Sequence, residues 1–322
     1  MSKKLQFVWI DDENRGQAFK TMKARLGVGG KFINVGKSNV NYLKDIATIK
    51  PDLIIVDHNL TNSDENIKKG STIASLIREK HPEMAIICVT GQDPSKIDNL
   101  EGLSYEAVFE IDQLGKHYES ILSIAKSFKK LNSDRPINID EFIALLKAPK
   151  IERIKLENII PMEIKENFED KALFQNISHW ITHILITRPG FLYNRLWSAT
   201  YLGLTEKGFK KVEDMFEKAK YKGLFADQTK ERWWKSSLIE ILSKEIKTTG
   251  LPWEKGRSLS GITHHDYSKD YYTDNKEDLP EVVAYTDETC TEEYPMKKKY
   301  TVPHPKFDKL LYFEEIGMMK ID

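Results

Sequence analysis

Two short apolar stretches that end in aspartate decide the fold of this chain: Leu5-Gln6-Phe7-Val8-Trp9-Ile10-Asp11-Asp12 and Leu53-Ile54-Ile55-Val56-Asp57. Short, β-branched runs bounded by charge predict buried strands of a parallel sheet. Because ligands bind at the carboxyl ends of such strands, we expect Asp11, Asp12 and Asp57 to converge in one crevice. Clustered carboxylates repel one another unless a hard cation joins them, and Mg²⁺ is the usual one. The sequence therefore predicts a magnesium site with phosphoryl capture on Asp57.

A third apolar run ends in a hydroxyl residue, Thr90, and this completes a pattern. With an acidic pair, a single aspartate and a threonine in this order, roughly the first 130 residues resemble the receiver domains of two-component response regulators. The resemblance implies that Asp11 and Asp12 hold Mg²⁺. It implies that Asp57 accepts a phosphoryl group from a histidine kinase or phosphotransfer protein, and that Thr90 binds a phosphoryl oxygen. Asn59 would offer its backbone carbonyl to the metal.

One position departs from the pattern of this family. Receiver domains end their fifth strand with an aromatic residue that acts as a switch, and three residues later carry a lysine that pairs with the phosphoryl group. Here the aromatic is Phe109, and the lysine position holds Asp112. An acid there adds repulsion on the order of a few kcal/mol in a partly dry site. Lys116 is the candidate substitute cation. Two readings stay open: a receiver that is phosphorylated weakly, and a pseudo-receiver that binds metal or a protein partner.

Length and composition predict a soluble globular protein with two domains, or with one domain plus an elaborated extension. The chain has 322 residues, with 49 basic and 49 acidic side chains and 40% hydrophobic residues. Formal neutrality gives no overall field that would attract nucleic acid. The N-terminus lacks the apolar segment of a signal peptide, and no run approaches the ~20 residues of a membrane span, so we expect a cytoplasmic protein. Two cysteines, Cys88 and Cys290, make neither a disulfide framework nor a zinc site.

Apolar strands and amphipathic helices alternate in the N-terminal part and predict five βα units. Right-handed crossovers then give a doubly wound, five-stranded parallel sheet of the flavodoxin-like type in residues 1–132. The polar stretch 133–136 indicates a linker. Residues 137–250 predict a mainly helical output domain, and residues 251–322 a mixed loop and strand extension packed on it. Helices are expected at 140–147, 162–187, 190–203, 205–221 and 227–247, and late strands at 299–302 and 310–313.

Histidines in the C-terminal part form two candidate metal clusters without a metal-binding signature. His179 and His183 are four residues apart on one predicted helix, a spacing that can bind a metal, but a third ligand is not evident. The run His264-His265-Asp266 could join His304 if the tail folds back, although adjacent histidines in an extended segment point apart. We therefore expect a packed helix face at the first pair and a solvated loop at the second.

Basic and aromatic residues between 205 and 247 form a pattern that is typical of a nucleic-acid-binding surface. The basic residues are Lys207, Lys210, Lys211, Lys218, Lys220, Lys222, Lys230, Arg232 and Lys235. These nine are offset by six acidic residues in the same window, so an ordinary solvated face is favoured. The leading interpretation is a response-regulator-like signalling protein whose helical output domain acts by protein–protein interaction. The alternatives are a nucleic-acid-binding regulator that uses helices 205–247 and an uncharacterised effector enzyme under receiver control.

Overall fold

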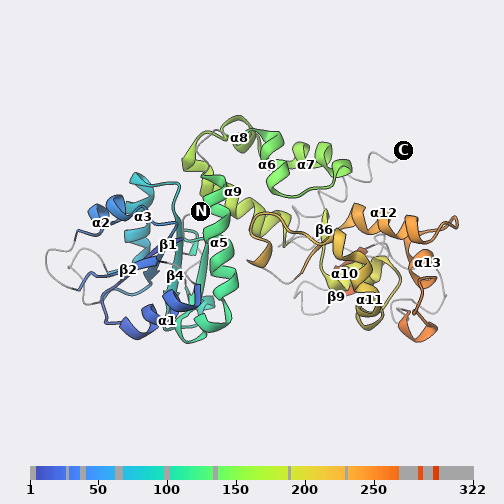
Figure 1. Ribbon diagram of the computed structural model, residues 1–322, viewed down its shortest axis with the longest axis horizontal. Helices are drawn as coiled ribbons and strands as arrows, with labels where there is room; N and C mark the ends of the chain where they lie inside the picture. Colours follow the sequence, from blue (N-terminus) through green and yellow to red (C-terminus); the bar gives the residue numbers. More distant parts are fainter. Residues whose placement is uncertain are drawn as a thin grey trace. The chain divides into compact units, whose positions relative to one another are not determined.

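The computed structural model describes most of the chain and shows two compact units. The described residues are 5–26, 29–36, 41–61, 68–97, 102–132, 137–187, 190–228 and 231–267, with the backbone of 282–285 and 293–296. Unit 1 comprises Met1–Leu145 and Ile160–Thr182, and unit 2 comprises Leu146–Ile159 and His183–Asp322. Figure 1 labels the elements of both units. Among the described residues, no helix is both long and apolar enough to cross a membrane.

Unit 1 is built on a five-stranded parallel sheet with the strand order β2-β1-β3-β4-β5. The strands are β1 (Gln6–Asp11), β2 (Gly29–Asn34), β3 (Leu53–Asp57), β4 (Ala85–Thr90) and β5 (Ala107–Glu110). The helices between and after them are α1 (Gly16–Leu26), α2 (Tyr42–Ile49), α3 (Gly70–Lys80), η1 (Pro94–Lys96), η2 (Ile111–Lys116) and α5 (Tyr118–Leu131). This order is that of flavodoxin-like doubly wound sheets, so the predicted fold class is confirmed for this part of the chain.

The sheet forms the core of unit 1 because its central strands are buried along their whole length. Every residue of β3 and β4 is buried, as expected for parallel strands with helices on both faces. Figure 1 shows α2 and α3 on one side of the sheet and α5 on the other. Helix α5 turns Ile121, Ile124 and Phe128 inward at helical spacing. Cys88 lies in this core with a fully buried thiol, in the strand that the sequence predicted for it.

A buried ion pair ties α3 to the connection before β5. The Arg78 guanidinium Nη2 lies 2.5 Å from Glu106 Oε1, and the other carboxylate oxygen of Glu106 accepts the Ile86 N–H at 2.5 Å. Burial raises the pKa of Glu106, while the charge of Arg78 and these hydrogen bonds oppose the shift. A buried charge keeps such a position only when it is paired and hydrogen-bonded, so the pair holds α3, β4 and the approach to β5 in one arrangement.

Segments beyond residue 137 also belong to unit 1. They include α6 (Ile139–Leu145), α8 (Met162–Glu166) and α9 (Phe174–His179). The single helix predicted for 162–187 is wrong, because Asp170 starts a new turn, η4 (Lys171–Leu173), by accepting the Ala172 N–H at 2.9 Å. After α9 the chain continues as a π-helix, η5 (Trp180–Leu185).

Helix α9 is hydrogen-bonded to the segment that leads into β5. The Gln175 side chain donates through Nε2 to the Leu103 carbonyl oxygen at 2.7 Å. One turn later, His179 Nε2 lies 3.3 Å from the Tyr105 carbonyl oxygen. Tyr105 is itself buried in the hydrophobic core of unit 1. A helix that the sequence placed in a separate output domain therefore contacts the segment that leads into the last strand of the sheet.

Unit 2 is helical, with two small antiparallel sheets in its described residues. Its helical elements are η3 (Lys150–Glu152), α7 (Arg153–Ile159), α10 (Arg195–Tyr201), α11 (Glu206–Val212), η6 (Glu213–Ala219), η7 (Ala226–Gln228), α12 (Lys235–Glu245), α13 (Pro252–Arg257) and η8 (His264–Asp266). Two short strands, β6 (Leu192–Tyr193) and β7 (Trp233–Trp234), pair antiparallel. Trp233 and Trp234 were expected on a helix face, and this is wrong. They lie in a strand because they pair with β6, and α12 begins only at the next residue.

The last part of the chain is described only in part. The backbone of β8 (Val282–Tyr285) pairs antiparallel with that of β9 (Glu293–Met296), in a stretch for which no strand was predicted. The predicted linker, 133–136, and the predicted strands 299–302 and 310–313 lie outside the described residues. The division into a receiver-like domain, a linker, a helical output domain and an extension stays a prediction.

Candidate metal and phosphoacceptor site

Three carboxylates meet at the carboxyl-terminal edge of the sheet in unit 1. Asp11 ends β1, Asp12 follows it, and Asp57 ends the adjacent β3. One carboxylate oxygen from each lies within 4.8 Å of the others, and all three side chains are buried. Among the described residues, this is the one group of histidine, cysteine and acidic side chains arranged to hold a metal ion. The predicted convergence of the three aspartates is therefore seen in the structure.

Backbone amides orient the two strand-end carboxylates. Asp11 Oδ1 accepts the Glu13 N–H at 2.8 Å, and Asp57 Oδ2 accepts the Asn59 N–H at 3.0 Å. Glycine at position 70 lets the start of α3 approach this edge closely, since a Cβ atom there would lie 2.1 Å from the Asp57 carbonyl oxygen. Each carboxylate thus has one oxygen fixed by the backbone. The role of the Asn59 carbonyl as a metal ligand stays a prediction.

The electrostatics of the cluster are those of crowded, desolvated acids. Burial raises the pKa of Asp57 to about 7, and the negative charge of Asp11 adds to the effect. Burial also raises the pKa of Asp11, against the opposing Glu13 amide and the nearby charge of Arg15. Ionised carboxylates in such a position need a positive partner. The donor set, three hard oxygen ligands, fits Mg²⁺ and not a soft transition metal.

Arg15 supplies a positive charge that the sequence analysis missed. Its Nε lies 3.4 Å from Asp11 Oδ2, and its Nη2 lies 2.8 Å from Glu13 Oε2. The same guanidinium lowers the pKa of Asp57 as well as that of Asp11. The signal available in the sequence was the spacing: Arg15 comes four residues after Asp11, just before the first turn of α1.

Thr90 lies where the receiver resemblance places it. Asp57 pairs with Val89 in the sheet register, so Thr90 ends the neighbouring strand one residue further on. Its side chain is almost fully buried, and its Oγ1 accepts the Gln92 N–H at 3.0 Å. The hydroxyl is held at the same edge of the sheet as the aspartates. Its contact with a phosphoryl group stays a prediction.

Phe109 lies in β5, and η2 holds both Asp112, at the position of the missing lysine, and Lys116, the candidate substitute. Phe109 is buried, and its ring packs against His117 with centroids 4.9 Å apart. Asp112 is exposed in η2. Lys116 is also exposed, and its Nζ lies 3.4 Å from Gln113 Oε1. The role of Lys116 as substitute cation stays a prediction; in the described structure the cation that acts on Asp57 is Arg15.

The histidine clusters give no assembled site in the described residues. His179 is occupied with the Tyr105 carbonyl, and His183 belongs to the other compact unit. The rings of His264 and His265 lie 3.8 Å apart, so the expectation that they point apart is wrong. Asp266 pairs with Lys211, whose hydrogen bond lowers the pKa of Asp266 to about 2. His304 lies outside the described residues.

Comparison with known proteins finds similarity in structure and not in sequence. No protein-family model and no curated protein matches the chain. The receiver domain of an HD domain-containing protein from Pseudomonas fluorescens Pf-5 is 15% identical, with 40% of this chain and 95% of that chain covered and a TM-score of 0.33. The receiver domain of a putative Luxo repressor protein from Vibrio parahaemolyticus is 18% identical, with 41% and 99% covered and a TM-score of 0.33.

A third solved structure is the response regulator protein TrrA from Thermotoga maritima in complex with Mg(2+)-BeF. It is 18% identical, with 36% of this chain and 98% of that chain covered and a TM-score of 0.29. The neighbours are receiver domains, and they match the N-terminal two fifths of the chain. The part of the chain that they match contains the five-stranded parallel sheet with the order β2-β1-β3-β4-β5.

Proposed function

We propose that the protein is a response-regulator-like signalling protein whose receiver-like part accepts a phosphoryl group on Asp57 with Mg²⁺ bound. The observation that carries the proposal is the buried cluster of Asp11, Asp12 and Asp57 at the carboxyl edge of the sheet. The strand order supports it, because it makes β1 and β3 neighbours and puts their carboxyl ends at the edge where such sheets bind ligands. Asp11, Asp12, Asp57 and the Asn59 carbonyl are the proposed metal ligands.

In the proposed chemical step one bond forms and one bond breaks. The free oxygen of the Asp57 carboxylate forms a bond to phosphorus, the bond from phosphorus to the donor atom breaks, and its electron pair leaves with the donor. A histidine nitrogen of a partner kinase or phosphotransfer protein is the proposed donor atom. Mg²⁺ supplies positive charge to the phosphoryl oxygens when it is bound. Asp57 must be ionised to attack, and its pKa of about 7 makes that depend on nearby positive charge.

Arg15 is the proposed replacement for the missing lysine. Its guanidinium already contacts Asp11 and acts electrostatically on Asp57. Preorganised positive charge at a phosphoryl group is a large term in such reactions, and arginine can bind phosphoryl oxygens with two N–H groups. Thr90 is proposed to donate its hydroxyl to a third oxygen. This assignment favours a working receiver over a pseudo-receiver, since the cation comes from the β1 side of the site instead of the β5 side.

The output is proposed to be a protein interaction made by the segments beyond residue 137. The contacts of Gln175 and His179 with the carbonyls of Leu103 and Tyr105 join α9 to the approach of β5. A shift of β5 after phosphorylation then changes the surface that α9 and its neighbours offer to a partner. We keep a cytoplasmic location as part of the proposal, because a histidine kinase domain would have to reach Asp57.

Intact-mass spectrometry tests the proposal. The full chain is incubated with acetyl phosphate and Mg²⁺, and one added phosphoryl group is expected. Asp57→Asn should abolish the added mass, while Asp140→Asn, a matched change at an exposed acid of α6, should leave it. Arg15→Gln should slow labelling and yet tighten Mg²⁺ binding in calorimetry, because the guanidinium no longer competes for Asp11. Labelling that survives in Asp57→Asn would place the phosphoacceptor elsewhere. An Arg15→Gln variant that labels at the original rate would remove Arg15 from the site.

A further inference from the structure

A tryptophan lies two residues before the first aspartate of the candidate metal site. Trp9 is in β1, and its side chain is fully buried. Because side chains alternate along a strand, Trp9 and Asp11 lie on the same face of the sheet. Val8 and Ile10 lie on the opposite face, in the core that contains Ile73 of α3. The indole ring and the Asp11 carboxyl are therefore successive side chains on one face of β1.

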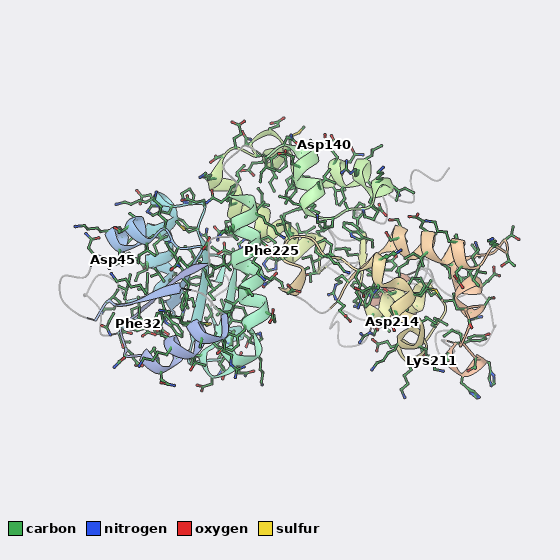
Figure 2. The ribbon with its side chains drawn as sticks, viewed as in Figure 1. Phe32, Asp45, Asp140, Lys211, Asp214 and Phe225 are labelled. Carbon is green, nitrogen blue, oxygen red and sulfur yellow. The ribbon has the colours of Figure 1, made fainter. Side chains whose placement is uncertain are left out.

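Aromatic rings on this face hold the indole in place. The centroid of the Trp9 ring lies 6.5 Å from that of Phe32 in β2, the strand that pairs with β1. Phe32, which Figure 2 labels in unit 1, meets Phe19 of α1 at 5.9 Å. Phe7, on the same face of β1 as Trp9, lies 5.2 Å from the Phe19 ring. These four rings pack α1 against the sheet and fix the orientation of the Trp9 side chain.

The indole N–H of Trp9 is a buried hydrogen-bond donor. Its Nε1 atom is shielded from solvent and has no acceptor at hydrogen-bond distance among the described residues. A buried tryptophan N–H usually has a partner, because a buried donor left without one costs about 1–3 kcal/mol. An orphaned donor beside a cluster of acids therefore points to a role at that cluster.

The Asp11 carboxyl is the acceptor on which this donor acts. Burial raises the pKa of Asp11. The Glu13 amide and the charge of Arg15 lower the pKa of that carboxyl, and the Trp9 side chain lowers it as well. The indole N–H thus lies toward the carboxylate, at a distance beyond that of a hydrogen bond. Of the three donors, the Glu13 N–H is fixed by the backbone and Trp9 by its packing, whereas the Arg15 side chain is 31% exposed.

We propose that the Trp9 indole N–H donates a hydrogen bond to the Asp11 carboxylate when Mg²⁺ is bound, and that Trp9 is thereby a positioning residue of the metal site. A donor behind a ligating carboxylate fixes its orientation, and loss of such a donor typically costs about 10–100-fold in metal affinity. The inference rests on the proposed function, because it requires Mg²⁺ at Asp11. In that function Arg15 turns to the phosphoryl group, so the two donors that remain on Asp11 are Trp9 and the Glu13 N–H.

Nuclear magnetic resonance of the full chain labelled with nitrogen-15 tests the hydrogen bond itself. The chain has six tryptophans, and the Trp9→Phe variant identifies the indole N–H signal of Trp9 by its loss. Addition of Mg²⁺ to the unmodified chain is expected to move this proton signal downfield, because the N–H gains an acceptor. The other five tryptophans lie at residue 180 or beyond, and their indole signals are the internal controls.

Isothermal titration calorimetry with Mg²⁺ measures the effect on the site. Trp9→Phe keeps an aromatic ring and removes the N–H, and it is expected to weaken Mg²⁺ binding about tenfold. The matched control, Phe32→Leu, disturbs the same group of rings and leaves the indole N–H in place, so it should change the affinity less than about twofold. Urea denaturation shows whether both variants are folded. Benzothienylalanine at position 9 has the shape of tryptophan with sulfur in place of the N–H, and it serves as the variant if Trp9→Phe does not fold.

Three results would overturn the inference and leave the proposed function in place. One is an unchanged Mg²⁺ affinity when the N–H of Trp9 is removed. Another is equal weakening in Trp9→Phe and Phe32→Leu, which would show that Trp9 acts on the site only through its packing. The last is a Trp9 indole signal that does not move downfield when Mg²⁺ saturates the unmodified chain. Absence of Mg²⁺ binding by the unmodified chain would overturn both this inference and the proposed metal site.

Discussion

Replacing Asp57 by asparagine should stabilise the metal-free protein at alkaline pH. The pKa of Asp57 is raised from an ordinary value of 3.8 to about 7, first by burial and then by Asp11. Because the folded-state pKa is the higher one, the folded protein retains a proton that the unfolded chain loses between about pH 4 and 7, and stability falls as the pH rises through that window. The difference between these two pKa values corresponds to about 4 kcal/mol, fully expressed above about pH 7. Asparagine has no charge to desolvate and still accepts the Asn59 N–H.

Urea denaturation with a chelator measures this effect at about pH 5 and pH 8. Asp57→Asn should be more stable than the unmodified chain by up to about 4 kcal/mol at the higher pH, and by less than half of that at the lower pH. Asp112→Asn, at an exposed acid, should change neither value by more than about 0.5 kcal/mol. Mg²⁺ should stabilise the unmodified chain more than the Asp57→Asn variant. Equal stability of the two proteins at about pH 8 without metal would refute the reasoning that the site is a cluster of destabilised carboxylates.

Three further outcomes are expected. Asp112→Lys should raise the rate at which acetyl phosphate labels Asp57, as intact mass shows, because a lysine then stands where receiver domains carry it; an unchanged rate would mean that this position lies too far from the phosphoryl group. Glu106→Gln should cost about 3 to 5 kcal/mol in urea denaturation, since it leaves the Arg78 charge buried without its partner, and a loss below about 1 kcal/mol would show that water reaches the pair. Hydrogen exchange with beryllofluoride and Mg²⁺ should change protection in β5, η2 and α9, and Gln175→Ala should weaken the change in α9 alone; protection changes confined to the sheet would separate the receiver from the output.

The receiver-like fold could be predicted because each of its central strands is a short apolar run that can be recognised from its own residues. β1, β3 and β4 could be recognised as apolar stretches, and the polar residue at the carboxyl end of each marked where the strand stops. Three aspartates at the ends of adjacent parallel strands must share one edge of the sheet, so their meeting followed from topology alone. Thr90 was singled out by the resemblance to receiver domains, and it ends β4.

The errors occurred where tertiary contacts overrode local pattern. Trp233 and Trp234 fit a helical stripe in sequence, but pairing with β6 through Leu192 and Tyr193 makes them a strand. The helix predicted for 162–187 missed the break at Asp170, because a capping aspartate is compatible with a helix surface until its backbone partner is known. Arg15 was missed for a different reason: its role depends on how α1 leaves β1, which residue spacing does not specify.

The position of the cation bears on how the site communicates with the rest of the chain. With all three carboxylates ionised, the cluster and Arg15 carry two net negative charges, the same number that a receiver has with its lysine, and one Mg²⁺ neutralises them. Metal binding depends mainly on this total. Signalling depends on which element moves when the charge at Asp57 changes, and Arg15 is attached to the β1–α1 connection instead of the end of β5. On the proposed function, a coupling typically worth about 1–3 kcal/mol would have to reach α9 through Thr90 and the β4–β5 pairing, without a side chain that spans from Asp57 to β5. On the proposed function, magnesium affinity and output coupling would therefore be separable, and Asp112→Lys is expected to strengthen the output coupling more than the magnesium affinity.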